Sequence, residues 1–270
     1  MSTGQSAESG LSPAQLGSLR DTSGSQTVLV VLPAYNEAVS LAAVLQALDR
    51  AGLESGMSLR LIVVNDGSSD STGEVARSYR GSVPLTLIDH PHNLGLGAAI
   101  RSGLLTAVDL ASDQDIVVTM DADDTHTPLA IAQMVTRINE GFDVLIASRY
   151  RPGSSVIGVP VHRRFLSYAA SLLFQLVFPI PGVRDFTCGY RAYRASVLRQ
   201  AFTRYREEFI NEEGFQCMVD ILLKLRRMNL RFSEVPLVLR YDRKGGKSKM
   251  KVLRTSLRTL RLMVRRRLES

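Results

Sequence analysis

The chain has 270 residues, 45% of them hydrophobic, so it can bury a sizeable core in one domain or in one domain with an extension. Its two cysteines do not make a disulfide framework, which indicates a reducing compartment. The formal net charge is +7, and the bases gather from Arg240 onward, which predicts an anionic partner for the C-terminal end. No apolar stretch reaches the roughly 18–20 residues that span a bilayer, so an integral membrane protein is not expected.

Residues 1–26 are rich in Ser, Gly, Gln and Thr, and we expect a disordered tail without a secretory signal. Short apolar runs then alternate with helical patterns. Strands are predicted over 27–32, 59–64, 85–88, 116–120 and 143–147, and helices from an Asn36 N-cap to Leu48, over 98–110 and over 128–140. This alternation predicts right-handed βαβ units around a mainly parallel sheet, hence an α/β fold.

Acidic residues directly follow two of the predicted strands. Asp66 comes after the second strand, and Asp121 and Asp123 come after the strand at 116–120. Because ligands of open α/β sheets bind at the carboxyl ends of the strands, we expect these carboxylates at one edge. The i, i+2 pair suits Mg²⁺ or Mn²⁺ shared with substrate phosphates. The alternative is a solvated acidic turn or a helix N-cap before Pro128.

The pattern changes after residue 150. Helices are predicted over 163–178 and 212–228, a last strand over 237–241, and a basic loop over 243–249. The final helix, 250–268, carries an apolar seam of Leu253, Leu257, Leu260 and Val264 beside a stripe of arginines. A basic amphipathic helix favours contact with a membrane surface. The alternatives are a helix docked on the protein body and a coiled-coil seam.

The ordered motifs resemble those of family 2 glycosyltransferases with the GT-A fold, most closely the polyprenyl- and dolichyl-phosphate sugar transferases typified by dolichyl-phosphate mannose synthase. The resemblance runs from about residue 27 to 250 and rests on residues 31–37, 64–70, 93–97, 121–123, 148–150, 185–191 and 246–249. It implies a GT-A domain over 27–249, followed by the helical segment 250–270.

The resemblance also implies roles for individual residues at the donor. Contacts with the nucleotide of a sugar donor fall to Pro33, Tyr35, Glu37, Asp66 and Asp121. Asp121 and Asp123 would hold Mg²⁺ or Mn²⁺ on the donor diphosphate. Thr125 stands where some members have Gln, so Asp124 or water would complete the metal shell.

On the acceptor side, the resemblance assigns phosphate contacts to Arg163, Ser167, Arg243, Ser248 and Lys249, and catalytic roles to Asp123, Arg149 and Lys249. For any one arginine taken alone, a surface ion pair is the alternative. A lipid phosphate is already anionic and needs no general base, whereas a sugar hydroxyl would need one. Glu212 and Glu213 are the candidates for that base, although acidic residues also suit the first turn of a helix.

The implied activity is inverting, metal-dependent transfer of a hexose to polyprenyl or dolichyl phosphate. GDP-mannose is the favoured donor and UDP-glucose the next. We expect the chain on the cytoplasmic face of a membrane, with a separate anchoring protein as one option and no nucleic acid as partner. The competing hypotheses are a transferase acting on a polysaccharide hydroxyl and a non-catalytic module that binds membrane or nucleic acid through its basic tail.

Overall fold

The computed structural model describes residues 25–243 and 252–268. Within these residues, seven strands form one sheet in the order β3-β2-β1-β4-β7-β5-β8. Its parallel core was predicted, and the strands are β1 (Thr27–Ala34), β2 (Ser58–Asn65), β3 (Leu85–Asp89), β4 (Ile116–Thr119), β5 (Val144–Ser148), β7 (Arg191–Arg194) and β8 (Phe232–Pro236). Only β7 runs antiparallel to its neighbours, β4 and β5. A small separate sheet pairs β6 (Ser155–Ile157) with β9 (Val238–Arg240) in parallel.

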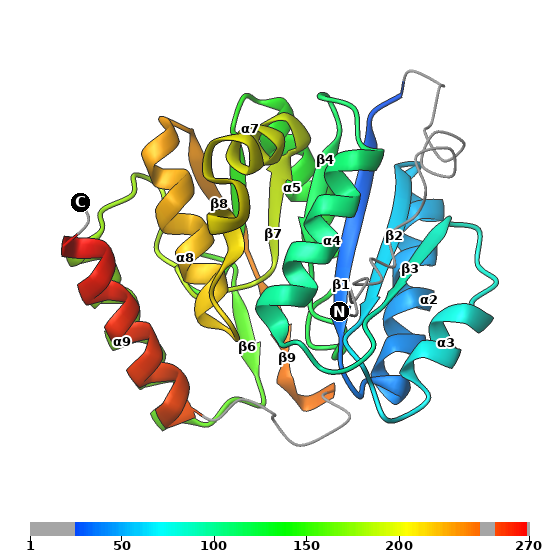
Figure 1. The fold of residues 1–270 in the computed structure, drawn as a ribbon, viewed down its shortest axis with the longest axis horizontal. Helices are drawn as coiled ribbons and strands as arrows, with labels where there is room; N and C mark the ends of the chain where they lie inside the picture. Colours follow the sequence, from blue (N-terminus) through cyan, green and yellow to red (C-terminus); the bar gives the residue numbers. More distant parts are fainter. Residues whose placement is uncertain (1–24, 244–251, 269–270) are drawn as a thin grey trace, which may run out of the picture.

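Helices cover both faces of the main sheet (Figure 1). They are α2 (Ala38–Ser55), α3 (Thr72–Ser78), α4 (Leu96–Leu110), α5 (Leu129–Asn139), α6 (Val161–Val177), α7 (Ala195–Tyr205), α8 (Gln216–Leu225) and α9 (Val252–Leu268), with 3₁₀ turns over Arg206–Ile210, Arg226–Met228 and Tyr241–Arg243. In the described part of the chain, no helix is both long and apolar enough to cross a membrane.

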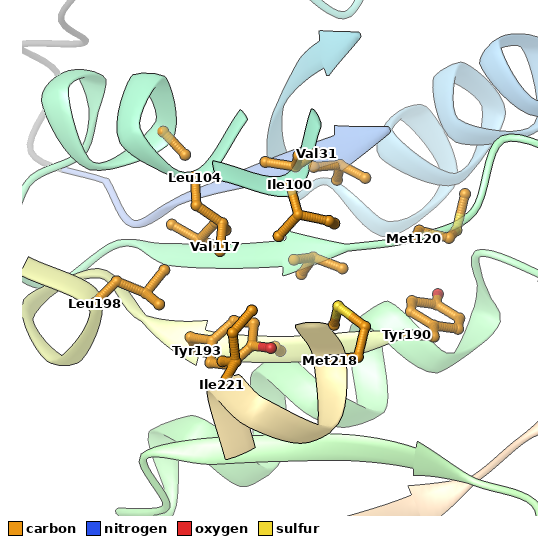
Figure 2. Close-up of a cluster of buried hydrophobic side chains, with 14 of the residues drawn as sticks. Val31, Ile100, Leu104, Val117, Met120, Tyr190, Tyr193, Leu198, Met218 and Ile221 are labelled. Atoms are coloured by element: carbon orange, nitrogen blue, oxygen red, sulfur yellow. The ribbon is translucent and has the colours of Figure 1, made fainter. Parts of the chain in front are cut away.

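The core continues across the sheet because its central strands are buried on both faces. Figure 2 shows Val31 of β1 and Val117 of β4 beside Ile100 and Leu104 of α4, with Tyr193 of β7 and residues of α8 close by. Gly103 lets α4 approach the sheet, because a Cβ there would lie 2.3 Å from a Val31 methyl group. This close packing holds the middle of α4 against β1 and β2.

The structure corrects several sequence-based boundaries. Asn36 is not the N-cap of α2, since Glu37 holds that position and Asn36 has a φ of 52°. The Asn36 amide oxygen instead accepts the N–H of Ser69 at 2.8 Å, which ties the first βα turn to the second. The helix expected over 212–228 begins at Gln216, and the strand expected over 237–241 is only β9.

The C-terminal helix α9 lies against α8 at one end of the molecule (Figure 1). Leu262 and Met263 are its buried residues, whereas Val264 of the predicted seam is exposed. The Arg266 guanidinium donates to both oxygens of buried Asp220, at 2.6 and 3.0 Å. The described part of α9 is therefore docked on the body, which was the alternative to membrane contact. The side chains of Leu253, Leu257 and Leu260 lie outside the described residues, as do positions 1–24 of the tail.

Candidate active site at the carboxyl edge of the sheet

The acidic residues meet at one edge of the sheet, as predicted. Strands β2, β1 and β4 are neighbours and run parallel, so their carboxyl ends coincide. The chain leaves β2 with the Asp66 N–H bonded to the Ala34 carbonyl at 2.9 Å, and leaves β4 with the Met120 N–H bonded to the Val31 carbonyl at 3.0 Å. Asp66 and Asp121 therefore share this edge.

Asp66 organises the loop that leads into α4. Its carboxylate is buried and accepts the backbone N–H groups of Leu94 and Gly95, both at 2.9 Å. His90 Nδ1 lies 2.7 Å from the same carboxylate, and His90 Nε2 lies 2.9 Å from the Ser102 hydroxyl. The sequence predicted a nucleotide contact for Asp66. In this structure its carboxylate holds the 90–95 loop beside the edge, so any ligand contact there depends on that loop.

Asp66→Asn is expected to lower the free energy of unfolding by about 1–3 kcal/mol, because one amide N–H would face the N–H of Leu94 or Gly95 and leave it unpaired. Denaturant unfolding measures the change. Asp113→Asn, at an exposed carboxylate that pairs with Arg199, is the matched control, for which we expect less than about 1 kcal/mol. Equal losses in the two variants would contradict the role given to Asp66.

The loop after β4 holds its two carboxylates differently. The Asp121 side chain is 39% exposed. Asp123 is buried and accepts both the Thr125 hydroxyl, at 2.6 Å, and the Thr125 N–H, at 3.2 Å. Asp124, between Asp123 and Thr125, adopts a φ of 59°. Thr125, noted in the sequence only as a replacement for Gln, thus orients Asp123.

The carboxylates of Asp121 and Asp123 fit a hard divalent cation whose other ligands are water molecules and substrate oxygens. Among the described residues, no group of three or more His, Cys, Asp or Glu side chains is arranged to enclose a metal. Two neighbouring carboxylates at an open edge suit Mg²⁺ or Mn²⁺ bound jointly with phosphate oxygens rather than a closed protein cage. Asp121 and Asp123 are the residues that would hold such an ion.

His126 is a residue to which the sequence analysis assigned no role at the site. Its Nδ1 lies 3.4 Å from the Asp121 nitrogen and 4.0 Å from the Asp121 carboxylate. Its ring stacks on Tyr190 with centroids 5.0 Å apart, and its backbone forms an antiparallel bridge with Leu239. His126 therefore links the acidic loop to both the 185–191 segment and β9. Only its place five residues after Asp121 signalled this role.

Basic residues from β9 and from the 3₁₀ turn after it border the acidic loop. The Arg240 N–H donates to the Thr125 carbonyl at 2.8 Å. Burial and the neighbouring Asp123 charge raise the pKa of Asp124, and the charges of Arg243 and Arg240 oppose that rise. The acceptor candidate Arg243 thus lies close to the acidic loop, and its contact with an acceptor phosphate stays a prediction. Ser248 and Lys249 lie outside the described residues.

Arg149 follows β5 and is held by a buried carboxylate. Its Nε and Nη2 donate to the two oxygens of Asp185 at 2.8 and 2.7 Å, and Nη2 also reaches the Thr187 hydroxyl at 2.6 Å. Burial alone would raise the pKa of Asp185, but the Arg149 charge and backbone N–H donors hold it below its usual value. The Arg149 side chain keeps 23% exposure. It is therefore a fixed cation that retains a solvent-facing side.

The 185–191 segment joins the Arg149 pair to the acidic loop. The Thr119 hydroxyl donates to the Gly189 carbonyl at 2.7 Å, and a Cβ at Gly189 would lie 3.6 Å from the nearer Asp121 oxygen. Arg191, fully buried, donates to the carbonyls of Phe186, Cys188 and Met218. The segment is thus rigidly held, with Arg149 at one end and Asp121 beside the other.

The remaining predicted site residues lie in two places, the connection from β1 to α2 and helix α6. Pro33 lies near the end of β1, Tyr35 is exposed in the following turn, and the Glu37 N–H donates to the Thr72 hydroxyl at 2.8 Å. Ser167, on α6, bonds the Tyr150 hydroxyl at 2.8 Å. Arg163 is also on α6, and its side chain is not described.

The two candidate bases take part in ion pairs with α9. Glu212 pairs with Arg265, and Glu213 lies 4.0 Å from Arg258 with its side chain 80% exposed. A Cβ at Gly97 would meet the Glu212 carbonyl, so this segment packs on the start of α4.

A cavity of about 330 Å³, lined by Thr27, Arg60 and Asp115 among others, opens at the opposite, amino-terminal edge of the sheet. It is separate from the acidic edge.

The chain has an α/β fold that matches solved GT-A structures. Glucosyl-3-phosphoglycerate synthase from Mycobacterium tuberculosis, solved with Mn²⁺, UDP and phosphoglyceric acid, superposes with a TM-score of 0.64 at 20% identity, over 93% of this chain and 82% of that one. A structure of the same enzyme with Mg²⁺ and UDP gives a TM-score of 0.61, also at 20% identity, over 94% of this chain and 82% of that one. At this identity the likeness concerns the fold alone.

Residues 29–202 match the model of glycosyl transferase family 2. The chain belongs to that family and is a glycosyltransferase. It is 33% identical over 224 residues to the undecaprenyl-phosphate mannosyltransferase of Micrococcus luteus, covering 83% of this chain and 87% of that protein. It is 32% identical over 229 residues to the polyprenol monophosphomannose synthase of Mycolicibacterium smegmatis, covering 83% and 81%. The dolichol-phosphate mannosyltransferase of Pyrococcus furiosus is 30% identical over 225 residues, which are 83% of this chain and 59% of that protein.

Proposed function

We propose that this chain transfers a hexose from a nucleotide-sugar to a polyprenyl phosphate: mannose from GDP-mannose in the first place, with glucose from UDP-glucose as the rival. The observation that carries the proposal is the likeness, over 83% of the chain, to two bacterial relatives named for mannose transfer to such lipids. The shared edge of Asp66, Asp121 and Arg149 supports it.

The donor diphosphate lies at the acidic loop in this proposal. Asp121 and Asp123 hold Mg²⁺ or Mn²⁺, which neutralises charge on the leaving nucleoside diphosphate when it is bound. Thr125 fixes the Asp123 carboxylate, and His126 fixes the backbone of Asp121. Pro33, Tyr35, Glu37 and the 90–95 loop held by Asp66 border the nucleotide.

The acceptor phosphate meets cations that restrain it for inverting attack on the anomeric carbon. Arg149 offers a planar guanidinium that is already oriented by Asp185, and Arg243 lies beside the acidic loop. Arg163, Ser167, Ser248 and Lys249 complete this group in the proposal. Because the phosphate oxygen is already anionic, positioning and charge carry the reaction without a general base.

Glu212 and Glu213 are therefore not assigned as bases. Their ion pairs with Arg265 and Arg258 give them a role in docking α9 instead. If the acceptor were a polysaccharide hydroxyl, Glu213→Gln would abolish transfer, whereas the phosphate acceptor leaves this variant with most of its activity. The measured rate of the purified variant thus separates the two acceptors.

The acceptor places the chain at a membrane surface, and we propose the cytoplasmic face, where nucleotide-sugars would be the soluble donors. A separate membrane protein as anchor is compatible with this placement, and nucleic acid is not a partner in it.

Incubation of the purified chain with GDP-mannose or UDP-glucose, Mn²⁺ or Mg²⁺ and a short-chain polyprenyl phosphate tests the proposal. We expect a mannosyl lipid from GDP-mannose and little product from UDP-glucose. A greater yield from UDP-glucose would overturn the sugar assignment, and no lipid-linked sugar with either donor would overturn the function.

A further inference from the structure

Helix α6 carries a continuous apolar stripe on its outer side. Val161, Phe165, Tyr168, Leu172 and Leu176 follow one another at spacings of three or four residues, and each is between 44% and 81% exposed. Such spacing puts them on one face of the helix. Scattered exposed hydrophobic residues are ordinary, but a row along a whole helix marks an interaction surface.

The opposite side of α6 is fixed to the protein body. Phe174 is buried and stacks on Phe186 with ring centroids 5.2 Å apart. The Ser171 hydroxyl donates to the Arg184 carbonyl at 2.6 Å. The exposed stripe therefore cannot turn inward without breaking this packing, so it belongs to the outer surface of the folded chain.

The helix that carries the stripe is basic. Residues 161–177 contain no Asp or Glu, and Arg164 is exposed on the helix beside the stripe. An apolar face with arginines and no acids suits a surface of anionic lipid headgroups. A helix of 17 residues is about 25 Å long at 1.5 Å per residue and would lie in the plane of that surface.

The inner side of α6 adjoins the proposed acceptor side of the site. Ser167 lies on α6 and bonds the Tyr150 hydroxyl, and Tyr150 directly follows Arg149. Phe186, which packs under α6, directly follows Asp185, the partner of Arg149. A lipid surface against α6 would therefore border the cation proposed to receive the lipid phosphate.

We propose that α6 is the element by which this chain lies on the bilayer that contains its acceptor. The stripe enters the headgroup region, and α9 remains docked on α8 through Asp220 and Arg266. This reassigns the membrane contact that the sequence alone favoured for the C-terminal helix. The inference rests on the proposed function for the identity of the bilayer lipid, but binding to vesicles is measured without turnover.

The test compares Phe165→Glu/Leu176→Glu with a matched control, Leu53→Glu/Leu129→Glu, which changes exposed leucines on α2 and α5. Co-sedimentation uses vesicles of phosphatidylcholine and phosphatidylglycerol containing polyprenyl phosphate. We expect the α6 variant to lose at least tenfold in vesicle partitioning and the control to change less than twofold. Transfer to polyprenyl phosphate in vesicles should fall in parallel, whereas transfer to a water-dispersed short-chain acceptor should stay within twofold of wild type.

Three outcomes would overturn the inference. The first is equal partitioning of the α6 variant and wild type. The second is loss of partitioning in Arg261→Glu, on the exposed side of α9, together with retention in the α6 variant. The third is a wild-type dimer, measured by light scattering, that the α6 variant converts to monomer, because a second copy would then cover the stripe. Absence of product from wild type with the short-chain acceptor would count against the proposed function and leave the partitioning result intact.

Discussion

Asp121→Ala is expected to lower kcat/KM for sugar transfer by about 10³-fold, since several kcal/mol of charge stabilisation at the leaving diphosphate would be lost and each 1.36 kcal/mol is tenfold in rate. Asp123→Ala should have a similar effect, because Asp123 is the second carboxylate proposed to hold the cation and Thr125 fixes it in the same loop. The measurement is the initial rate at saturating acceptor, with Mn²⁺ varied.

The control for this pair is Asp113→Ala, which removes an exposed carboxylate near the opposite edge of the sheet. We expect its rate to stay within twofold of wild type. Circular dichroism and thermal unfolding should be unchanged for Asp121→Ala, because its side chain is 39% exposed. A rate for Asp121→Ala within tenfold of wild type would remove this carboxylate from the reaction.

Asp185→Ala is expected to lower the free energy of unfolding by about 3–5 kcal/mol, because it leaves the Arg149 guanidinium without its partner at a mostly buried site. It also removes the acceptor for the backbone N–H groups of Arg149 and Cys188. Urea unfolding measures the loss. Glu140→Ala, which breaks the exposed pair with Arg137, should cost less than about 1 kcal/mol.

The same pair predicts a pH dependence with a definite sign. The folded-state pKa of Asp185 is lowered, so its contribution to stability is fully present above the ordinary carboxyl pKa of about 3.9. That contribution is lost as the pH falls through the lower folded-state value. The stability difference between wild type and Asp185→Asn should therefore be constant from pH 5 to 7 and shrink below pH 4. A difference that grows on acidification would contradict the ion pair.

The parallel half of the fold could be predicted because its signals are local. Apolar runs such as 27–32 and 59–64 end in turns that a helical pattern follows, and the structure has β1 and β2 there. The antiparallel β7 was missed because two of its four residues are arginines. Arg191 is buried because three carbonyls accept its N–H groups, two from the preceding turn at Phe186 and Cys188 and one from Met218, which only the folded chain brings close.

At the candidate site, too, the features set by local sequence could be predicted, and the contacts between separate loops could not. Because strand polarity decides on which edge a residue lies, the meeting of Asp66 with Asp121 followed from the order of strands and helices. The partners of Asp66, Arg149 and His126 could not be derived, since His90, Asp185 and Tyr190 come from other loops. The amphipathic pattern of α9 was recognised, but the buried Asp220 on α8 that holds Arg266 was not visible in any local pattern.

Metal-dependent binding of a nucleoside diphosphate tests the central claim most directly. Thermal unfolding is recorded with GDP at a hundredfold excess over its dissociation constant, with and without Mn²⁺, for wild type and Asp121→Ala. Ligand at that excess adds about 2.7 kcal/mol to stability, so the predicted result is a rise in Tm for wild type that requires both GDP and Mn²⁺ and is absent in Asp121→Ala. A rise in Tm that is the same without Mn²⁺, or the same in Asp121→Ala, would contradict the account.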